Sequence, residues 1–204
     1  MRARMTLSYA GISFEVREIE LSHKPASMLE ISPKGTVPVL YLCENNKILE
    51  ESLDIIRWAL AQNDPDGWAV WSDSGQKDIE ALIHRNDIEF KTALDKYKYP
   101  DRNPERTQEQ YRHDCESIFR DLEGRLEQHR FLIGARISIA DISLFPFIRQ
   151  CANVDLEWFL GSDYRKLIQW LKAFEDSLLY KSIMIKYNPW QSGDIPILVD
   201  PIRR

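Results

Sequence analysis

The apolar pattern of the chain changes at the turn-rich segment 63–67 (NDPDG). Up to about residue 62, short alternating runs typical of strands mix with short amphipathic helices. From about residue 72, apolar residues recur at helical spacing over long segments. The change predicts an α+β region followed by an all-helical domain. We expect a first domain at 1–62, a linker at 63–71, a helical domain at 72–187 and an extended tail at 188–204.

The first region alternates helix and strand signals. Its opening segment has helix-forming composition and stops at Gly11, a residue suited to a helix C-terminus. The turn at 44–46 separates two apolar runs and predicts a hairpin. The expected helices are 1–10, 24–30 (a short helix or turn) and 52–61, and the expected strands are 14–19, 37–42 and 47–49.

The second region reads as helical throughout. Segment 138–152 is apolar on nearly every side, which indicates a central, buried helix. Segment 104–129 carries one apolar stripe and is expected to pack by one face. The expected helices are 72–97, 104–129, 138–152, 162–174 and 177–185.

Composition excludes several classes of protein. The 204 residues carry a net charge of -5 with a pI of about 5.5, which argues against a nucleic-acid partner. No apolar stretch is long enough to span a membrane, and no secretory signal opens the chain. The cysteines Cys43, Cys115 and Cys151 are odd in number and widely spaced, so we expect free thiols in a reducing, cytoplasmic setting and no metal site.

Val37-Pro38 precedes an apolar strand and is the first candidate for chemistry. An X-Pro bond adopts the cis form at modest cost. A cis bond here would turn the backbone N–H and C=O of Val37 outward, where an extended peptide can pair with them. A trans proline that simply opens a strand is the alternative on these residues alone.

Glu51-Ser52 stands at the start of a predicted helix and is the second candidate. The first N–H groups of a helix lack internal partners, and the helix dipole favours an anion there. Ser52 can add a hydroxyl donor to a bound carboxylate, and Glu51 can accept from a ligand ammonium. The alternative makes Ser52 an ordinary N-cap and Glu51 a solvated side chain.

Ser138 and Asp141 form a capping-box pattern at the start of the central helix, with Ile137 and Ile142 at the hydrophobic-staple positions. We interpret this pair as structural. Asp141 is expected to be a buried folding element and not a catalytic acid.

These three features, in this order and spacing, resemble the cytosolic glutathione transferase family over essentially the whole chain. Residues 34–40 (KGTVPVL) are similar to its cis-proline loop, Glu51-Ser52 to its γ-glutamyl site, and residues 138–141 (SIAD) to the start of its central helix. Residues 23–26 (HKPA) resemble the omega-like, cysteine-type transferases and their bacterial relatives.

The resemblance implies a thioredoxin-like N-terminal region and an all-α C-terminal domain. It implies glutathione as co-substrate, held by Lys24, Val37, Pro38, Glu51 and Ser52, with Lys24 at the glycine end; a surface lysine is the alternative for Lys24. It implies an electrophile or disulfide as second substrate, and a homodimer. The acceptor is expected against the helix at 79–97, where the candidates are Asn86, Asp87, Lys91 and Tyr97.

One part of the family pattern has no counterpart here. In the family, a first strand leads to a Cys-Pro or Ser-Pro pair at a helix N-terminus, where the dipole lowers the pKa of a thiol. Segment 1–11 resembles the body of that helix, so the activating residue is expected about four positions before Met1. Cys43, Cys115 and Cys151 are interpreted as packed thiols and not as nucleophiles.

The resulting hypothesis is a glutathione transferase that conjugates glutathione or exchanges thiols in its full-length form. This chain alone is expected to show little turnover. The alternative is a non-catalytic member of the fold that binds glutathione or another protein.

Overall fold

In the computed structural model, which describes residues 1–201, both ends of the chain build one unit and the middle segment builds another. The first unit comprises Met1–Asp66 and the chain from Leu178 on, and the second comprises Gly67–Ser177. The sequence pattern assigned residues 177–185 to the helical domain. The structure groups α10 (Leu178–Ile183) with the first unit, because α10 packs on α1 (Arg2–Tyr9).

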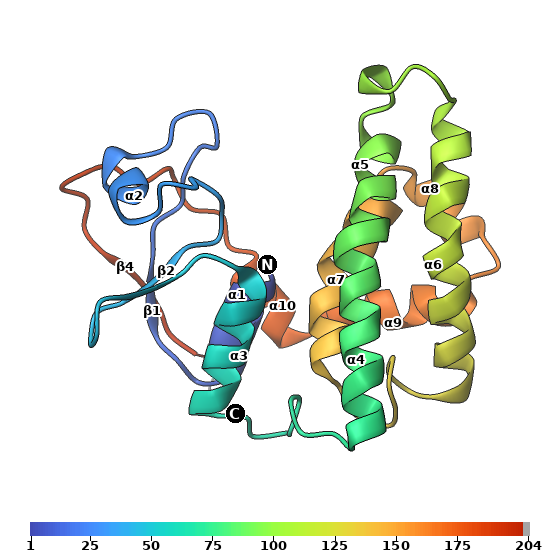
Figure 1. The fold of residues 1–204 in the computed structure, drawn as a ribbon, viewed down its shortest axis with the longest axis horizontal. Coiled ribbons are helices and arrows are strands. Elements are labelled where there is room, and N and C mark those ends of the chain that lie inside the picture. The colour runs from blue at the N-terminus through green and yellow to red at the C-terminus, as the bar shows by residue number, and fades with distance from the viewer. Residues whose placement is uncertain (202–204) are drawn as a thin grey trace. The chain divides into compact units, whose positions relative to one another are not determined.

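The first unit is built on two helices, α1 and α3 (Ser52–Gln62), which pack side by side (Figure 1). Small residues on α1 and α3, Ala3 and Ala59, let the helices approach, and Leu7 and Ile55 fill the contact. The remaining elements of the unit are β1 (Phe14–Val16), α2 (Ala26–Ile31), β2 (Leu40–Leu42), β3 (Lys47–Leu49) and β4 (Ile197–Val199).

The predicted hairpin forms from β2 and β3. The two strands pair antiparallel with Leu40 opposite Leu49 and Leu42 opposite Lys47. Asn46 takes the left-handed conformation at φ 56, which asparagine tolerates better than most residues. Strand β2 begins at Leu40 and not at Val37 as predicted, since Pro38 has no N–H to donate to a ladder.

The C-terminal tail adds a strand that the sequence pattern did not predict. Strand β4 pairs antiparallel with β1, with Phe14 opposite Val199 and Val16 opposite Ile197. Earlier in the tail, the Trp190 N–H donates to the Glu18 carbonyl at 2.7 Å. Among the described residues, β1 and β2 are not hydrogen-bonded to each other, so the unit holds two separate two-stranded sheets.

The second unit is a helical bundle. The predicted helix at 72–97 is interrupted by a π-helical turn at Asn86–Phe90, and the short helix α8 was not predicted. Figure 1 shows α4, α5 and α6 as its long visible rods. The elements are α4 (Asp73–Arg85), the π turn, α5 (Lys91–Lys98), a 3₁₀ turn at Pro100–Arg102, α6 (Gln108–Gln128), α7 (Ile139–Ala152), α8 (Leu156–Gly161) and α9 (Arg165–Asp176).

Aromatic rings form the core of this bundle. Phe145 on α7 packs on Phe174 of α9 with centroids 5.1 Å apart, and Trp170 meets Phe174 at the same distance. A second group surrounds Phe119 of α6, whose ring lies 5.6 Å from that of Phe159. Eleven residues of α7 are buried, as the apolar pattern predicted for a central helix.

Asp141 ties the start of α7 to its surroundings. Its carboxylate is fully buried and accepts from the Ser138 N–H at 2.9 Å, the Ser138 hydroxyl at 2.8 Å, the Leu132 N–H at 3.1 Å and the Trp170 indole N–H at 2.9 Å. Burial raises the pKa of Asp141, and these four hydrogen bonds oppose that rise. Because four donors surround the carboxylate, its role is structural: it is a polar hub that joins the start of α7 to Leu132 and to Trp170 of α9.

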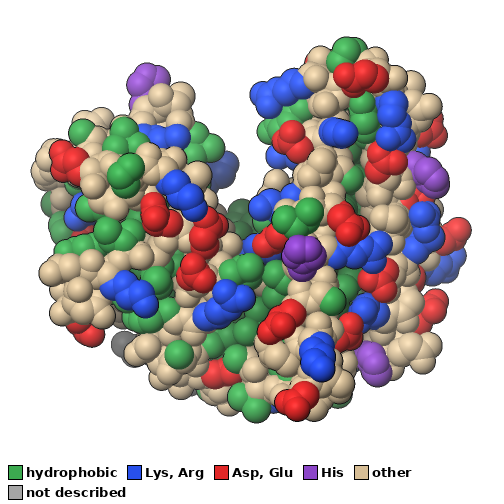
Figure 2. All heavy atoms as spheres, in the orientation of Figure 1, with side chains coloured by type: hydrophobic (Ala, Val, Ile, Leu, Met, Phe, Trp, Pro, Cys, Tyr) green, Lys and Arg blue, Asp and Glu red, His purple; other side chains and the backbone are tan. Residues whose placement is uncertain are grey.

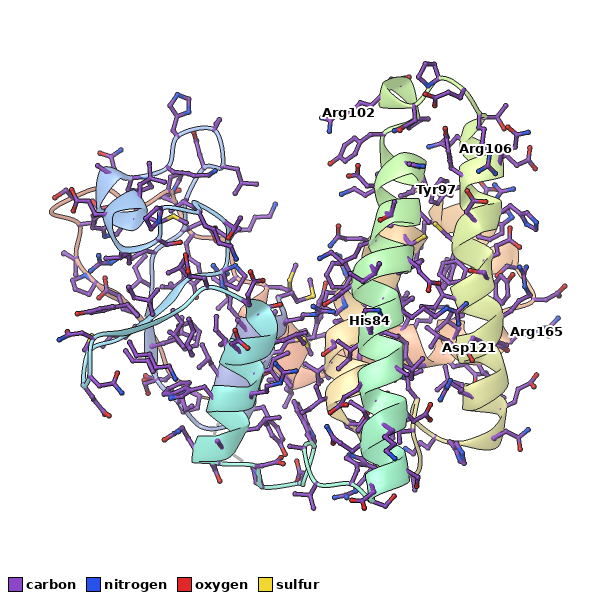
Figure 3. All side chains as sticks on the ribbon, viewed as in Figure 1. His84, Tyr97, Arg102, Arg106, Asp121 and Arg165 are labelled. Atoms are coloured by element: carbon purple, nitrogen blue, oxygen red, sulfur yellow. The ribbon has the colours of Figure 1, made fainter. Side chains whose placement is uncertain are left out.

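Charges are spread over both units. Figure 2 shows acidic and basic side chains intermixed on the visible face. An example is Asp121 on α6 (Figure 3), which accepts from Arg85 of α4 at 2.9 Å and from Arg125 at 3.1 Å. Across residues 1–201, no helix is long and apolar enough to cross a membrane, and no group of three metal-binding side chains occurs.

Candidate functional site

Ser32 holds the loop at 32–38 in place. This side chain is fully buried, and its hydroxyl donates to Glu50 Oε1 at 2.6 Å. Gly35 follows with φ +60, a conformation that favours glycine, and its N–H donates to the Ser32 carbonyl at 2.9 Å. The loop is therefore held in place at Ser32 and turns tightly at Gly35, just before its exposed residue Val37.

That exposed end is Val37. The Val37-Pro38 peptide bond is cis, and the Val37 residue is 50% exposed. Within residues 1–201, neither the N–H nor the C=O of Val37 makes a hydrogen bond. Both groups are therefore open to a ligand.

Lys24 lies beside the same loop. A Cβ built on Gly35 would fall 3.5 Å from Lys24 Nζ, so the ammonium sits directly over the glycine. Lys24 is half-buried, and its Cδ lies at the same 3.5 Å from that Cβ position, so the side-chain stem runs along the loop. The structure thus brings Lys24 next to the turn that leads to Val37.

Glu51 and Ser52 form the start of α3. Glu51 is the N-cap residue and Ser52 the first helical residue, so the alternative that made Ser52 the N-cap is wrong. The Glu51 carbonyl accepts from Asp54 and Ile55, both at 3.1 Å. In the described part of the chain, the N–H groups of Ser52 and Leu53 have no partner. Together with the helix dipole they offer two donors to an anion.

Two cations that the sequence analysis did not select touch this pair. Arg2 Nη1 donates to the Ser52 hydroxyl at 3.4 Å, and Arg2 is only 5% exposed. Lys34 Nζ lies 2.6 Å from Glu51 Oε1, and this contact raises the pKa of Lys34. Arg2 and Lys34 were missed because their partners lie far along the chain. For Lys34, its place in the cis-proline loop was the available signal.

The arrangement suits a peptide with an amino-acid head group. The open N–H groups and the Ser52 hydroxyl can receive a carboxylate, and Glu51 can accept from an ammonium. The open backbone of Val37 can pair with an extended peptide, and Lys24 can meet a second carboxylate. All of these groups belong to the first unit.

The three cysteines lie elsewhere. Cys43 is exposed in the turn after β2, so the prediction of a packed thiol is wrong for this residue, whereas Cys115 and Cys151 are buried between helices of the second unit. The hydrogen bond to Cys115, and then burial, raise the pKa of the Cys151 thiol. A thiol in that state is a poor nucleophile at neutral pH, since the thiolate is the reactive form.

The residues expected on the acceptor side belong to the π turn and to α5. Asn86 donates to Asp87 Oδ1 at 2.8 Å, and the Lys91 ammonium lies 5.2 Å from the centre of the Phe147 ring. Tyr97, labelled on α5 in Figure 3, is 2% exposed, and burial raises its pKa to about 12. Its hydroxyl is enclosed in the bundle near Cys151 and Arg112, so Tyr97 is a core residue and not a ligand contact.

A separate hollow lies between the loop before α2 and the C-terminal tail. Its volume is about 780 Å³, and it contains none of Lys24, Val37, Glu51 or Ser52. Its walls are formed by Glu20, His23, Pro25, Ala26, Ser27, Asn188, Pro189, Trp190, Gln191 and Ser192.

Known proteins share both units. Residues 1–67 match the family model "Glutathione S-transferase, N-terminal domain", and residues 105–173 match "Glutathione S-transferase, C-terminal domain". A similar curated protein is the "Probable glutathione S-transferase MSR-1" of Nicotiana plumbaginifolia, 28% identical over 190 residues, which cover 90% of this chain and 83% of the relative.

Solved structures share the fold. Glutathione transferase F2 from Populus trichocarpa superimposes with a TM-score of 0.73 at 21% identity, covering 90% of this chain and 91% of that one. URE2P6 from Phanerochaete chrysosporium, solved in complex with oxidized glutathione, gives a TM-score of 0.76 at 18% identity, with 89% and 88% covered.

Proposed function

The chain belongs to the glutathione S-transferase family, and from that premise we propose that it binds glutathione at the start of α3 and along the loop at 32–38. The Ser52 hydroxyl and the open N–H groups of Ser52 and Leu53 receive the γ-glutamyl carboxylate, and Glu51 accepts from the α-ammonium. Val37 and Pro38 line the cysteinyl backbone, and Lys24 meets the glycine carboxylate. The thioredoxin-like first unit supplies all of these groups.

The observation that carries this proposal is the pair of open donors on α3. Two unpartnered N–H groups at the N-terminus of an 11-residue helix, beside a hydroxyl, match a carboxylate in geometry and charge. The unpaired N–H and C=O of Val37 match the peptide backbone that would follow. URE2P6, which was solved in complex with oxidized glutathione, has the same fold and supports this choice of ligand.

The proposed reaction is glutathione conjugation or thiol transfer. The residues described above hold and orient the tripeptide, and none of Cys43, Cys115 or Cys151 stands at a helix N-terminus, where the dipole would lower the pKa of a thiol. This placement favours a second candidate function, glutathione binding without turnover by the chain itself. As in its family, we infer a homodimer as the working form, which light scattering on the purified chain would test.

Calorimetric titration of the purified chain with glutathione tests the proposal. Ser52→Ala removes the hydroxyl donor to the carboxylate and should weaken binding about tenfold, the usual cost of one hydrogen bond to a charged group. Ser27→Ala, which removes an exposed hydroxyl on α2, is the matched control and should change affinity less than about twofold. Absence of binding, or equal effects of the two variants, would refute the site.

Turnover separates the two candidate functions. Binding with no conjugation of a standard aromatic electrophile supports the binding module for this chain. Conjugation that survives replacement of all three cysteines would show that another group activates the thiol.

A further inference from the structure

Lys34 and Glu51 form an ion pair inside the proposed glutathione site. Lys34 Nζ lies 2.6 Å from Glu51 Oε1, and the two side chains are 57% and 61% exposed. Lys34 belongs to the loop at 32–38 and Glu51 caps α3, so the pair joins the two elements that carry the proposed contacts. An ammonium of the protein therefore already contacts one oxygen of the carboxylate that an incoming ammonium would use.

The neighbouring carboxylate does not offer a second acceptor of the same kind. Glu50 Oε1 accepts from the buried Ser32 hydroxyl at 2.6 Å, which commits Glu50 to holding the loop. Lys34 contacts Oε1 of Glu51, so a ligand ammonium can reach the carboxylate at Oε2. Because Lys34 already neutralises the charge of Glu51, a second ammonium gains less from this carboxylate than it would from an unpaired one.

We propose that Lys34 sets how strongly this site depends on the α-ammonium of its ligand, by acting as an internal substitute for that group in the free protein. The inference rests on the proposed function. Its consequence is that the native site discriminates weakly between glutathione and an analogue that lacks only the amino group. Removing Lys34 leaves Glu51 without its partner and makes the amino group a requirement for full affinity.

Two ligands and two variants test this inference. The ligands are S-methylglutathione and its analogue with glutaryl in place of the γ-glutamyl residue, which lacks only the amino group. The variants are Lys34→Met, which keeps the length of the side chain, and Lys47→Met, which removes an exposed lysine charge on β3 as the matched control. Calorimetry gives the ratio of the two affinities for each protein, and thermal melting confirms that each is folded.

The expected affinity ratio is below about twofold in the native chain and in Lys47→Met, and it rises by about 1.5- to fivefold in Lys34→Met, the range measured for exposed ion pairs. The ratio cancels any general loss of attraction for an anionic ligand, because both ligands carry the same carboxylates. An unchanged or smaller ratio in Lys34→Met would overturn the inference while leaving the glutathione site standing. No binding of either ligand by the native chain would overturn both.

Discussion

The two units of this molecule differ in how far they bury their side chains and in how they pair their polar groups. In the bundle, α7 buries eleven of its side chains, and the polar hub Asp141 is sealed among four donors. In the first unit, α2 buries none of its residues, and Val37 is half exposed with unpaired backbone groups. The bundle pairs the polar groups around Asp141 internally, while the first unit leaves several backbone groups open at one place.

The difference links stability to the bundle and binding to the first unit. Apolar burial and closed hydrogen bonds stabilise a unit, whereas open donors and strained turns cost free energy unless a ligand meets them. The candidate site therefore lies in the less completely packed unit. Substitutions in the bundle should alter unfolding, and substitutions around the loop at 32–38 should alter binding. Five variants test this division, in order of decreasing expected effect.

Asp141→Ala should cause the largest change, confined to the bundle. It leaves the donors of Leu132, Ser138 and Trp170 buried without an acceptor, and we expect the free energy of unfolding to fall by about 3–5 kcal/mol. Hydrogen exchange measured by mass spectrometry should show faster exchange in α7 and α9. Similar acceleration in α1 and α3 would contradict independent units.

Gly35→Ala should have the next largest effect and act on the first unit. The residue has φ +60, and a Cβ there would lie 3.1 Å from the Leu29 side chain. We expect a loss of about 1–2 kcal/mol from the left-handed backbone alone, together with weaker glutathione binding. Gly124→Ala, in helix α6 where a Cβ meets nothing within 4 Å, is the control and should be neutral or stabilising. Equal outcomes for both glycines would show that the turn does not matter.

A matched pair of tyrosines should respond in opposite directions. Tyr9→Phe in the first unit loses a hydrogen bond to Asp64 at 2.9 Å and one from the Asp66 N–H at 2.8 Å, and should lower stability by about 1–2 kcal/mol. Tyr97→Phe in the bundle removes a buried hydroxyl that has no partner among the described residues, and should raise stability by about 1 kcal/mol. Urea titrations at neutral pH check both signs.

The same tyrosines predict an alkaline loss of stability. Burial raises the pKa of Tyr9, and it raises that of Tyr97 to about 12. The unfolded chain then releases these protons at a lower pH than the folded chain does. The contribution of the two protonated hydroxyls to the free energy of unfolding is therefore complete below about pH 10 and disappears as the pH rises toward 12. Each Phe variant should flatten the fall of unfolding free energy over this window. An unchanged slope would show that neither hydroxyl is protected by folding.

Trp190→Ala should have the smallest effect. It removes the ring that stacks 4.6 Å from the Arg17 guanidinium, but it keeps the backbone hydrogen bond to Glu18. We expect a loss of about 0.5–1 kcal/mol, the usual contribution of an exposed cation–π contact. Hydrogen exchange should increase in β1 and stay constant in α6. Unaltered exchange in β1 would show that the tail contributes nothing to that strand.

Local patterns predicted the elements whose signals are local. The hairpin followed from the turn at 44–46, the central helix from continuous apolarity at 138–152, and its polar start from the spacing of Ser138 and Asp141. The fold class, a thioredoxin-like region with an all-α domain, followed from the order of the motifs and is confirmed. The roles of Lys24, Val37, Pro38, Glu51 and Ser52 stay predictions, as does the omega-like class.

Features that depend on distant partners escaped prediction. Lys34 meets a residue 17 positions away and Arg2 one 50 positions away, and neither spacing has a sequence signature. Strand β4 is three residues long and lies between Pro196 and Pro201, so its composition gave no strand signal. The π turn at Asn86–Phe90 preserves a helical apolar spacing and therefore looked like uninterrupted helix.

The pairing of β1 with β4 has a consequence for the order in which the protein is made. The partner of Phe14–Val16 is Ile197–Val199, and α10, which packs on α1, comes after the whole bundle. On the ribosome the bundle is therefore synthesised in full before the first unit receives its last elements, and domains generally fold as units during synthesis. The segment that carries the proposed glutathione site would wait, exposed and partly assembled, until α10 and β4 emerge from the ribosome.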